Sequence, residues 1–132
     1  MIGLLRRMLL LSGLAAMLAA PALAGELPKK VGGCAKTTIK SVETRLVDGT
    51  TNQPIPNSGS AVTFANGGAQ VSYETVPAIE QSRAGDPVQL CLVSIPRNCP
   101  KGDDRGRIYK STNLRTHKTW RLPDSEHVCG GA

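Results

Sequence analysis

Acid, hydroxyl and imidazole side chains stand closest together at Asp124-Ser125-Glu126-His127, near the end of the 132-residue chain. A nucleophilic triad needs a base within hydrogen-bond reach of the nucleophile and a third group that orients the base. Adjacency in sequence does not provide that geometry, and no Gly-x-Ser-x-Gly motif accompanies the group. We therefore interpret it as a turn in which Asp124 or Ser125 accepts backbone hydrogen bonds, beside an exposed histidine. A small hydrolase that uses these residues is the alternative.

Other candidate chemistry is sparse. Asp103-Asp104 is a carboxylate pair, but basic residues flank it on both sides, which is typical of a solvated turn. His127-x-Cys129 is the closest His/Cys pair, and it lacks the paired ligands that a zinc site needs. The sequence has no phosphate loop, dinucleotide-binding fingerprint or calcium loop. We therefore predict no catalytic residue, no metal site and no cofactor.

The four cysteines, Cys34, Cys91, Cys99 and Cys129, have the most definite chemistry. They all follow residues 1–24, which carry an arginine pair, an apolar run and a final Ala-Leu-Ala, the layout of a secretory signal peptide. Export brings thiols into an oxidising compartment, where an even number of cysteines usually forms disulfides. The sequence therefore predicts a periplasmic or secreted protein with disulfides and no membrane span after the signal peptide.

Four cysteines allow three pairings. Cys91 and Cys99 bracket a nine-residue segment that contains Pro96 and is followed by Pro100, so a turn could bring them together. Cys34 and Cys129 lie near the two ends of the remaining chain and could clasp those ends. We therefore favour Cys34–Cys129 together with Cys91–Cys99.

Positive charge is concentrated in residues 97–121, which hold eight basic side chains against two acidic ones. Residues 25–96 carry six of each sign, and the last eleven residues add two acids and no base. Basic groups beside aromatic rings can bind polyanions or sugars, so this segment is the candidate binding site. The alternative is that its basic side chains only solvate an exposed hairpin. The candidates are Arg97, Lys101, Arg105, Arg107, Tyr109, Lys110, Arg115, Lys118, Trp120 and Arg121.

Turn-forming residues divide the chain after residue 24 into short strands. Asn66-Gly67-Gly68 separates strand-like runs at 61–65 and 70–75, and Asn-Gly tolerates the backbone of a tight hairpin turn. The run 88–95 is the most apolar strand and is expected to be central, with Pro96 ending it. The other expected elements are a flexible leader at 25–33, a first strand at 37–47 with a bulge or a break where Ile39 and Val42 fall out of phase, a long loop at 48–59, a helical turn at 77–84 ended by Gly85, and a last hairpin at 107–122.

This order, with a helical turn after the third strand, predicts an all-β fold: a small antiparallel barrel or sandwich with one short helix, braced by disulfides. Among barrels it favours the OB-like type, and an SH3-like barrel or an open sheet would give nearly the same order of elements. We expect residues 1–24 to be the signal peptide and residues 25–132 to form a single small domain. In the last hairpin, Ile108 opposite Trp120 would place basic residues opposite one another, which is repulsive. We therefore favour Tyr109 opposite Trp120.

Three stretches of the chain carry a recognisable pattern: Gly85-Asp86-Pro87-Val88 leading to Cys91-Leu92, Cys99-Pro100 with Gly102-Asp103, and the ending Cys129-Gly130-Gly131-Ala132. With these stretches the chain resembles a group of small exported bacterial proteins that contain four cysteines. The resemblance implies export and a single domain, and it implies no site residue.

We interpret the chain as an exported, non-enzymatic binding module. Its expected partner is an anionic lipid head group, a cell-wall polymer or an acidic protein surface, and nucleic acid is a poor partner for an exported protein. A hypothesis from another class is an inhibitor of a hydrolase that presents the disulfide-braced loop 96–106.

Overall fold

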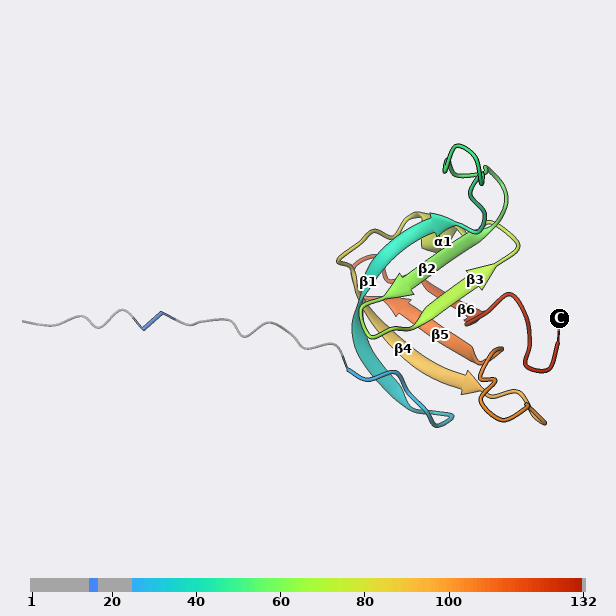
Figure 1. Cartoon of the computed structure of the whole chain (residues 1–132). Helices are drawn as coiled ribbons and strands as arrows, with labels where there is room; N and C mark the ends of the chain where they lie inside the picture. The colour runs from blue at the N-terminus through green and yellow to red at the C-terminus, as the bar shows by residue number, and fades with distance from the viewer. Residues whose placement is uncertain (1–14, 17–24, 132) are drawn as a thin grey trace, which may run out of the picture.

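The computed structural model describes residues 15–16 and 25–131. These residues form antiparallel strands and one helix of a single turn, which lies between the third and fourth strands (Figure 1). The predicted signal peptide lies outside the described residues, apart from positions 15 and 16. No helix in the described ranges is both long enough and apolar enough to cross a membrane. The elements are β1 (Cys34–Thr44), β2 (Ser60–Phe64), β3 (Ala69–Ser72), α1 (Pro77–Glu80), β4 (Pro87–Ser94), β5 (Ile108–Asn113) and β6 (Thr119–Pro123).

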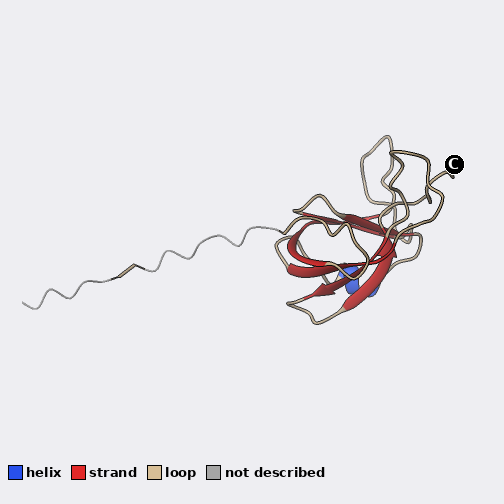
Figure 2. Cartoon of the chain, turned by 90° about the horizontal axis from the view of Figure 1, so that it is seen from below, coloured by secondary structure: helices blue, strands red, loops and turns tan. Residues whose placement is uncertain are grey.

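The strands form a six-stranded sheet in the order β3-β2-β1-β4-β5-β6, and all neighbours in it are antiparallel. The sheet curls into a half-barrel (Figures 1 and 2). The all-β prediction is confirmed, and the architecture is one curled sheet with the short helix after its third strand. β4 lies between β1 and β5 in the middle of the sheet, as its apolar sequence predicted.

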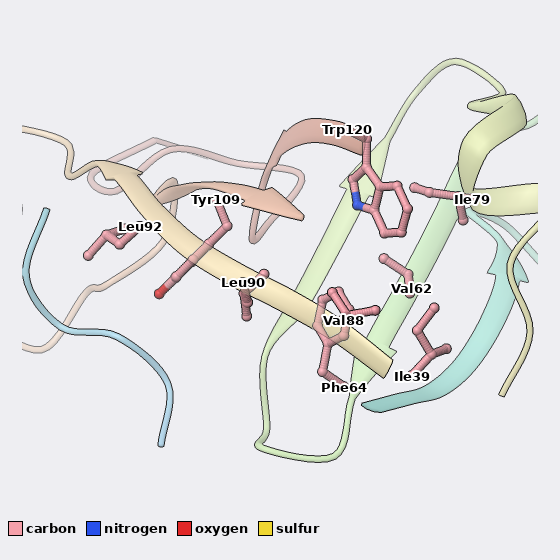
Figure 3. Close-up of a cluster of buried hydrophobic side chains, with 9 residues drawn as sticks. All are labelled: Ile39, Val62, Phe64, Ile79, Val88, Leu90, Leu92, Tyr109 and Trp120. Carbon is pink, nitrogen blue, oxygen red and sulfur yellow. The ribbon is translucent and has the colours of Figure 1, made fainter. Parts of the chain in front are cut away.

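The concave face of the sheet buries side chains that alternate along the strands. On β4, Val88, Leu90 and Leu92 are buried, and the residues between them are only partly covered. On β2, Val62 and Phe64 are buried in the same way. Burial of every second side chain is expected for a strand in a sheet that has one face covered, because successive side chains point to opposite faces. Figure 3 shows these five side chains gathered into one cluster with Ile39, Ile79, Tyr109 and Trp120.

Several local predictions are confirmed. The Asn66-Gly67-Gly68 turn joins β2 to β3, with Gly67 at φ +87°. The pairing of β1 with β2 shifts register between Ile39 and Ser41, where the sequence predicted a bulge. Gly85 follows the helical turn at φ +89°, a conformation that glycine adopts without steric cost. The helix is shorter than expected, since it ends at Glu80.

Residues 25–33 are held against the sheet, so the expectation of a flexible leader is wrong. The backbone N–H of Gly25 donates to the carbonyl oxygen of Lys36 at 2.7 Å. Pro28 is buried, and Leu27 packs against the core cluster. The expectation rested on proline, lysine and glycine content, which does not show where the backbone donors of a segment find their partners.

The cysteine pairing predicted from the sequence is wrong. The disulfides join Cys34 to Cys91 and Cys99 to Cys129. β1 and β4 are neighbours in the sheet, and their register places Cys34 opposite Cys91 with the two Cα atoms 4.1 Å apart. This proximity follows from the order of strands in the sheet, which the spacing of cysteines along the chain does not reveal. The second disulfide fastens the irregular C-terminal tail to the loop between β4 and β5.

The register expected for the last hairpin is also wrong. Trp120 lies opposite Ser111 rather than opposite Tyr109. In this register both aromatic rings point into the core (Figure 3). The same register places Lys110 opposite Arg121 on the other face. Tyr109 opposite Trp120 would also place both rings on one face, so burial does not separate the two registers. The turn between the strands sets the observed one, because the backbone N–H of Asn113 donates to the carbonyl oxygen of Lys118 at 2.9 Å.

Candidate functional site

Tyr109 and Trp120 were candidate binding residues, but the structure places both in the core. Their exposed fractions are 1 % and 5 %. The indole Nε1 of Trp120 donates to Gln70 Oε1 at 2.8 Å, so its polar edge is occupied inside the protein. Neither ring offers a face to a partner, and the candidate site therefore reduces to basic side chains.

Three of the basic candidates contact carboxylates of the protein itself. Arg115 binds Asp86 through two nitrogens, with Nε 2.6 Å from Oδ1 and Nη2 2.9 Å from Oδ2. Arg105 makes the same two-pronged contact with Asp103, and both distances are 2.9 Å. Arg107 is half-buried beside a third carboxylate. Arg115 and Arg105 therefore hold turns of the protein together through their carboxylate contacts, whereas the contact of Arg107 is a single one of 3.5 Å to an exposed carboxylate.

The same contacts hold the pKa values of two carboxyls well below their usual range. For Asp86 the largest cause is the hydrogen bond from Arg115, and burial opposes it. For Asp103 the largest cause is the hydrogen bond from Arg105, followed by the backbone N–H of Gly130. Both carboxylates are therefore ionised at neutral pH and act as anchors for the chain around them.

We expect the free energy of unfolding to fall as the pH drops below the ordinary aspartate pKa of 3.8. A carboxyl with a lowered pKa in the folded state stabilises the fold above its unfolded-state pKa, and this stabilisation is lost as the pH falls. Asp124 acts in the opposite direction, because burial raises its pKa. Urea unfolding between about pH 6 and about pH 2.5 measures the decrease. It should be smaller in Asp86→Asn, and an equal decrease in variant and wild type would contradict the assignment.

The residues from Asp124 to His127 make structural contacts, as the turn interpretation predicted. The Oδ1 atom of Asp124 accepts a hydrogen bond from the backbone N–H of Gly106 at 2.8 Å. The Oγ atom of Ser125 accepts one from the backbone N–H of His127 at 3.2 Å. Within residues 25–131, no hydrogen bond joins a histidine ring to a hydroxyl or a carboxylate. The geometry of a nucleophile activated by a base is therefore not present in this part of the chain.

The other five basic candidates are exposed, and none of them forms an ion pair within the described residues. Arg97 and Lys101 lie on the loop between β4 and β5, and Lys118 lies in the turn between β5 and β6. Lys110 on β5 and Arg121 on β6 are directly opposite each other. Their neighbours along each strand are buried or half-buried, so both side chains lie on the convex face of the sheet.

The sheet register extends this pair across two more strands. Lys110 is opposite Cys91 on β4, and Cys91 is opposite Cys34 on β1. The Cys34–Cys91 disulfide therefore lies in the same row as Lys110 and Arg121. Side chains that face each other on neighbouring strands have Cβ atoms about 5 Å apart, so the row is a continuous strip of surface.

A second row on the same face adds a third cation. It runs from Lys36 on β1 through β4 and β5 to β6, and its other members are neutral: Gln89, Thr112 and Thr119. Lys36 is exposed and was not among the candidates from the sequence. Its place in an alternating run of exposed residues was visible, but only the sheet order brings it beside residues 97–121. We call Lys36, Lys110 and Arg121 the outer cationic face.

The positive charge of the outer cationic face is not compensated locally. Neither row contains an acidic side chain. Like charges directly opposite one another destabilise a sheet, whereas the next pair on the same two strands, Thr112 and Thr119, is neutral. An anion that contacts both Lys110 and Arg121 would relieve this repulsion and accept charge-assisted hydrogen bonds. The arrangement is suited to binding an anion.

Two hollows in the described surface lie away from the outer cationic face. One, of about 540 Å³, is lined by residues 101–105 together with Asp124 and Ser125. The other, of about 690 Å³, is lined by the end of β1, the loop that follows it and Glu80. Among the residues that the structure describes, no group of three or more His, Cys, Asp or Glu side chains is placed to hold a metal ion.

Comparison with known proteins adds no relative to these observations. No family model, no curated protein and no solved structure matches the chain.

Proposed function

We propose that this protein is an exported, non-enzymatic binding module that holds an anionic partner on its outer cationic face. The observation that carries the proposal is Lys110 opposite Arg121, an exposed like-charge pair with no acidic side chain in its row or in the next one. The two disulfides support export, because disulfides form and persist in oxidising compartments. The resemblance to small exported four-cysteine proteins supports the same location.

The shape of the site favours an extended partner. Pockets for small molecules are concave and bury most of their ligand. The outer cationic face lies instead on the convex side of a curled sheet (Figure 1). A polymer or a surface that repeats its negative charges can contact Lys36, Lys110 and Arg121 together. The proposed partner is therefore an anionic component of the cell envelope or an acidic protein surface.

Titration with an anionic glycan, anionic lipid vesicles and an acidic protein tests this function. We expect binding at about 50 mM salt and much weaker binding at about 300 mM salt, because screening shortens the reach of exposed charges. Lys110→Thr combined with Arg121→Thr should weaken binding at least tenfold. Arg97→Thr combined with Lys101→Thr removes the same charge from the β4–β5 loop and is the matched control. Absence of binding to all three partners at low salt would refute the proposal.

The same Lys110→Thr/Arg121→Thr variant should be more stable than the wild type. It replaces a repulsive pair with a copy of the neutral Thr112–Thr119 pair beside it, so we expect the free energy of unfolding to rise by about 0.5 kcal/mol. Urea unfolding at neutral pH and low salt measures the change, with Arg97→Thr/Lys101→Thr as the control for net charge. A lower free energy of unfolding than that of the control would show that Lys110 and Arg121 stabilise the fold, which would contradict the inference that their repulsion destabilises it.

An inhibitor that presents the loop 96–106 is the second candidate, and a specific observation favours it. The loop is fixed by the Cys99–Cys129 disulfide, and Asp103 accepts a hydrogen bond from the backbone N–H of Gly130 in the tail at 3.0 Å. A rigid loop loses less entropy when it binds. An inhibitor would lose affinity for its enzyme in the Arg97→Thr/Lys101→Thr variant and keep it in the Lys110→Thr/Arg121→Thr variant, which is the reverse of the result expected for the outer cationic face.

A further inference from the structure

The two disulfides of this protein lie in different surroundings. Cys34 is exposed and Cys91 is half-buried, and both side chains lie on the convex face, away from the core. Cys99 and Cys129 are both half-buried, between the β4–β5 loop and the tail. An incoming thiolate must reach a sulfur atom from outside, so access favours attack at Cys34.

Charge also distinguishes the two bonds. Lys110 is directly opposite Cys91, and Arg121 follows in the same row. A nearby cation stabilises a thiolate, and a better-stabilised thiolate leaves faster in thiol–disulfide exchange. Beside the other bond, the carboxylate of Asp103, which accepts a hydrogen bond from the backbone N–H of Gly130 next to Cys129, is already paired with Arg105, so neither charge is left to act on the sulfur atoms. The favourable leaving group is therefore Cys91.

We propose that the Cys34–Cys91 disulfide is a site of thiol–disulfide exchange with a partner that carries two thiols. The first partner thiolate attacks Cys34 Sγ, a mixed disulfide forms, and Cys91 Sγ leaves as a thiolate beside Lys110. The second partner thiolate then attacks the partner sulfur of the mixed disulfide and releases Cys34. The partner loses two protons and two electrons and becomes a disulfide, and the protein takes them up as the Cys34 and Cys91 thiols.

The fold is built to survive this reduction. β1 and β4 pair over five residues on each strand, from Cys34 opposite Cys91 to Thr38 opposite Pro87. The disulfide lies at the first residue of β1, at one end of that pairing. The buried side chains of both strands point to the opposite face of the sheet. Opening the bond therefore exposes no core residue, and the exchange is a second activity, separate from the binding of anions.

Reduction of the intact, folded protein tests the proposal. The full chain is treated with 2-mercaptoethanol, a neutral thiol, or with reduced glutathione, an anionic thiol, and free thiols are alkylated at intervals and mapped by mass spectrometry. We expect Cys34–Cys91 to open at least tenfold faster than Cys99–Cys129, with the mixed disulfide on Cys34. A reduced peptide with two cysteines should gain one disulfide for each Cys34–Cys91 bond that opens.

A charge-matched pair of variants tests the role of Lys110. Lys110→Gln should slow the opening about threefold with both thiols, because the leaving thiolate loses its cation, and Lys101→Gln should leave the rate unchanged. Equal rates for the two disulfides, or a mixed disulfide on Cys91, would overturn the proposal. A slower reaction of Lys110→Gln with glutathione alone would also overturn it, because Lys110 would then only attract anions. The thiolate of 2-mercaptoethanol carries no charge beyond that of its reacting sulfur, so slowing with both thiols reports on the reacting sulfur atoms whether or not the outer cationic face binds an anionic partner.

Discussion

Replacing Gln70 with leucine is expected to lower the free energy of unfolding by about 3 kcal/mol, although leucine has a similar size and is more apolar. Gln70 lies on β3 with 1 % of its surface exposed. Its side chain reaches across the open side of the half-barrel to β5 and β6. The loss follows from the hydrogen bonds that leucine cannot make, because each buried polar group left without a partner costs about 1–3 kcal/mol.

The Gln70 amide uses its full hydrogen-bonding capacity. Its Nε2 atom donates to the carbonyl oxygens of Tyr109 and Leu122 at 2.7 and 3.1 Å. Its Oε1 atom accepts from the hydroxyl of Ser111 and from the indole Nε1 of Trp120. One side chain thus joins the two edge regions of the sheet, where no backbone ladder connects β3 to β6. Such a network stabilises a structure only when all of its members are satisfied.

Gln89→Leu is the matched control for this prediction. Gln89 is half-buried on the convex face of β4, and its side chain makes no hydrogen bond within the described residues. We expect Gln89→Leu to change the free energy of unfolding by less than about 0.5 kcal/mol. Urea unfolding of both variants measures the difference. If Gln70→Leu lowered the free energy of unfolding no more than Gln89→Leu does, the inference that Gln70 closes the half-barrel would be wrong.

Replacing Asp86 with alanine should lower the free energy of unfolding by about 3 kcal/mol. Asp86 is 3 % exposed and accepts hydrogen bonds from three residues: Arg115, the side chain of Asn113 at 2.9 Å, and the backbone N–H of Arg83 at 3.0 Å. The carboxylate joins the segment after α1 to the turn between β5 and β6. Removing the carboxylate leaves its hydrogen-bond donors without a partner. In a fully buried ion pair this loss costs about 3–5 kcal/mol. We expect a value at the lower end of that range, because Arg115 is partly exposed.

Asp104→Ala is the control for the Asp86 prediction. Asp104 is 78 % exposed, and its Oδ1 atom lies 3.5 Å from the Nη2 atom of Arg107. Exposed ion pairs of this kind contribute about 0–1 kcal/mol. Thermal and urea unfolding should therefore show little change in Asp104→Ala and a large change in Asp86→Ala. Similar values for the two variants would show that the buried carboxylate does not hold these turns together.

Local features of the fold could be predicted from the sequence because their causes are local. The Asn66-Gly67-Gly68 turn, the bulge in β1 and the left-handed Gly85 each depend on a few neighbouring residues. The alternation of Val88, Leu90 and Leu92 predicted a strand with one buried face. The order of strands with a helical turn after the third then led to the correct fold class.

Features that depend on which strands become neighbours could not be predicted. The pairing of Cys34 with Cys91 requires β1 beside β4, although 57 positions separate the two cysteines. Gln70 gave no signal in the sequence, since a glutamine on a short strand is ordinarily exposed. Repulsion between basic residues suggested the wrong register for the last hairpin, because the register follows from the turn that the Asn113–Lys118 backbone hydrogen bond closes.

The outer cationic face overlaps in part with the residues that the sequence nominated. Residues 97–121 contain Lys110 and Arg121, and the concentration of positive charge pointed to them. A count of charges does not show which basic side chains are already paired within the protein. Arg105 is paired with Asp103, two residues away in the sequence, and Arg115 is paired with the distant Asp86. The concentration of charge in residues 97–121 also left out Lys36, which belongs to the outer cationic face because β1 pairs with β4 in the sheet.

Lys110 and Arg121, in the function proposed for this protein, are placed for binding and not for folding. The most direct test is the ratio of dissociation constants for one anionic glycan at about 50 mM salt, measured for Lys110→Thr/Arg121→Thr and for Arg97→Thr/Lys101→Thr. Both variants lose two positive charges, so the ratio isolates position from net charge. We predict that the first variant binds at least tenfold more weakly than the second, a difference of about 1.4 kcal/mol. Equal dissociation constants would contradict the claim.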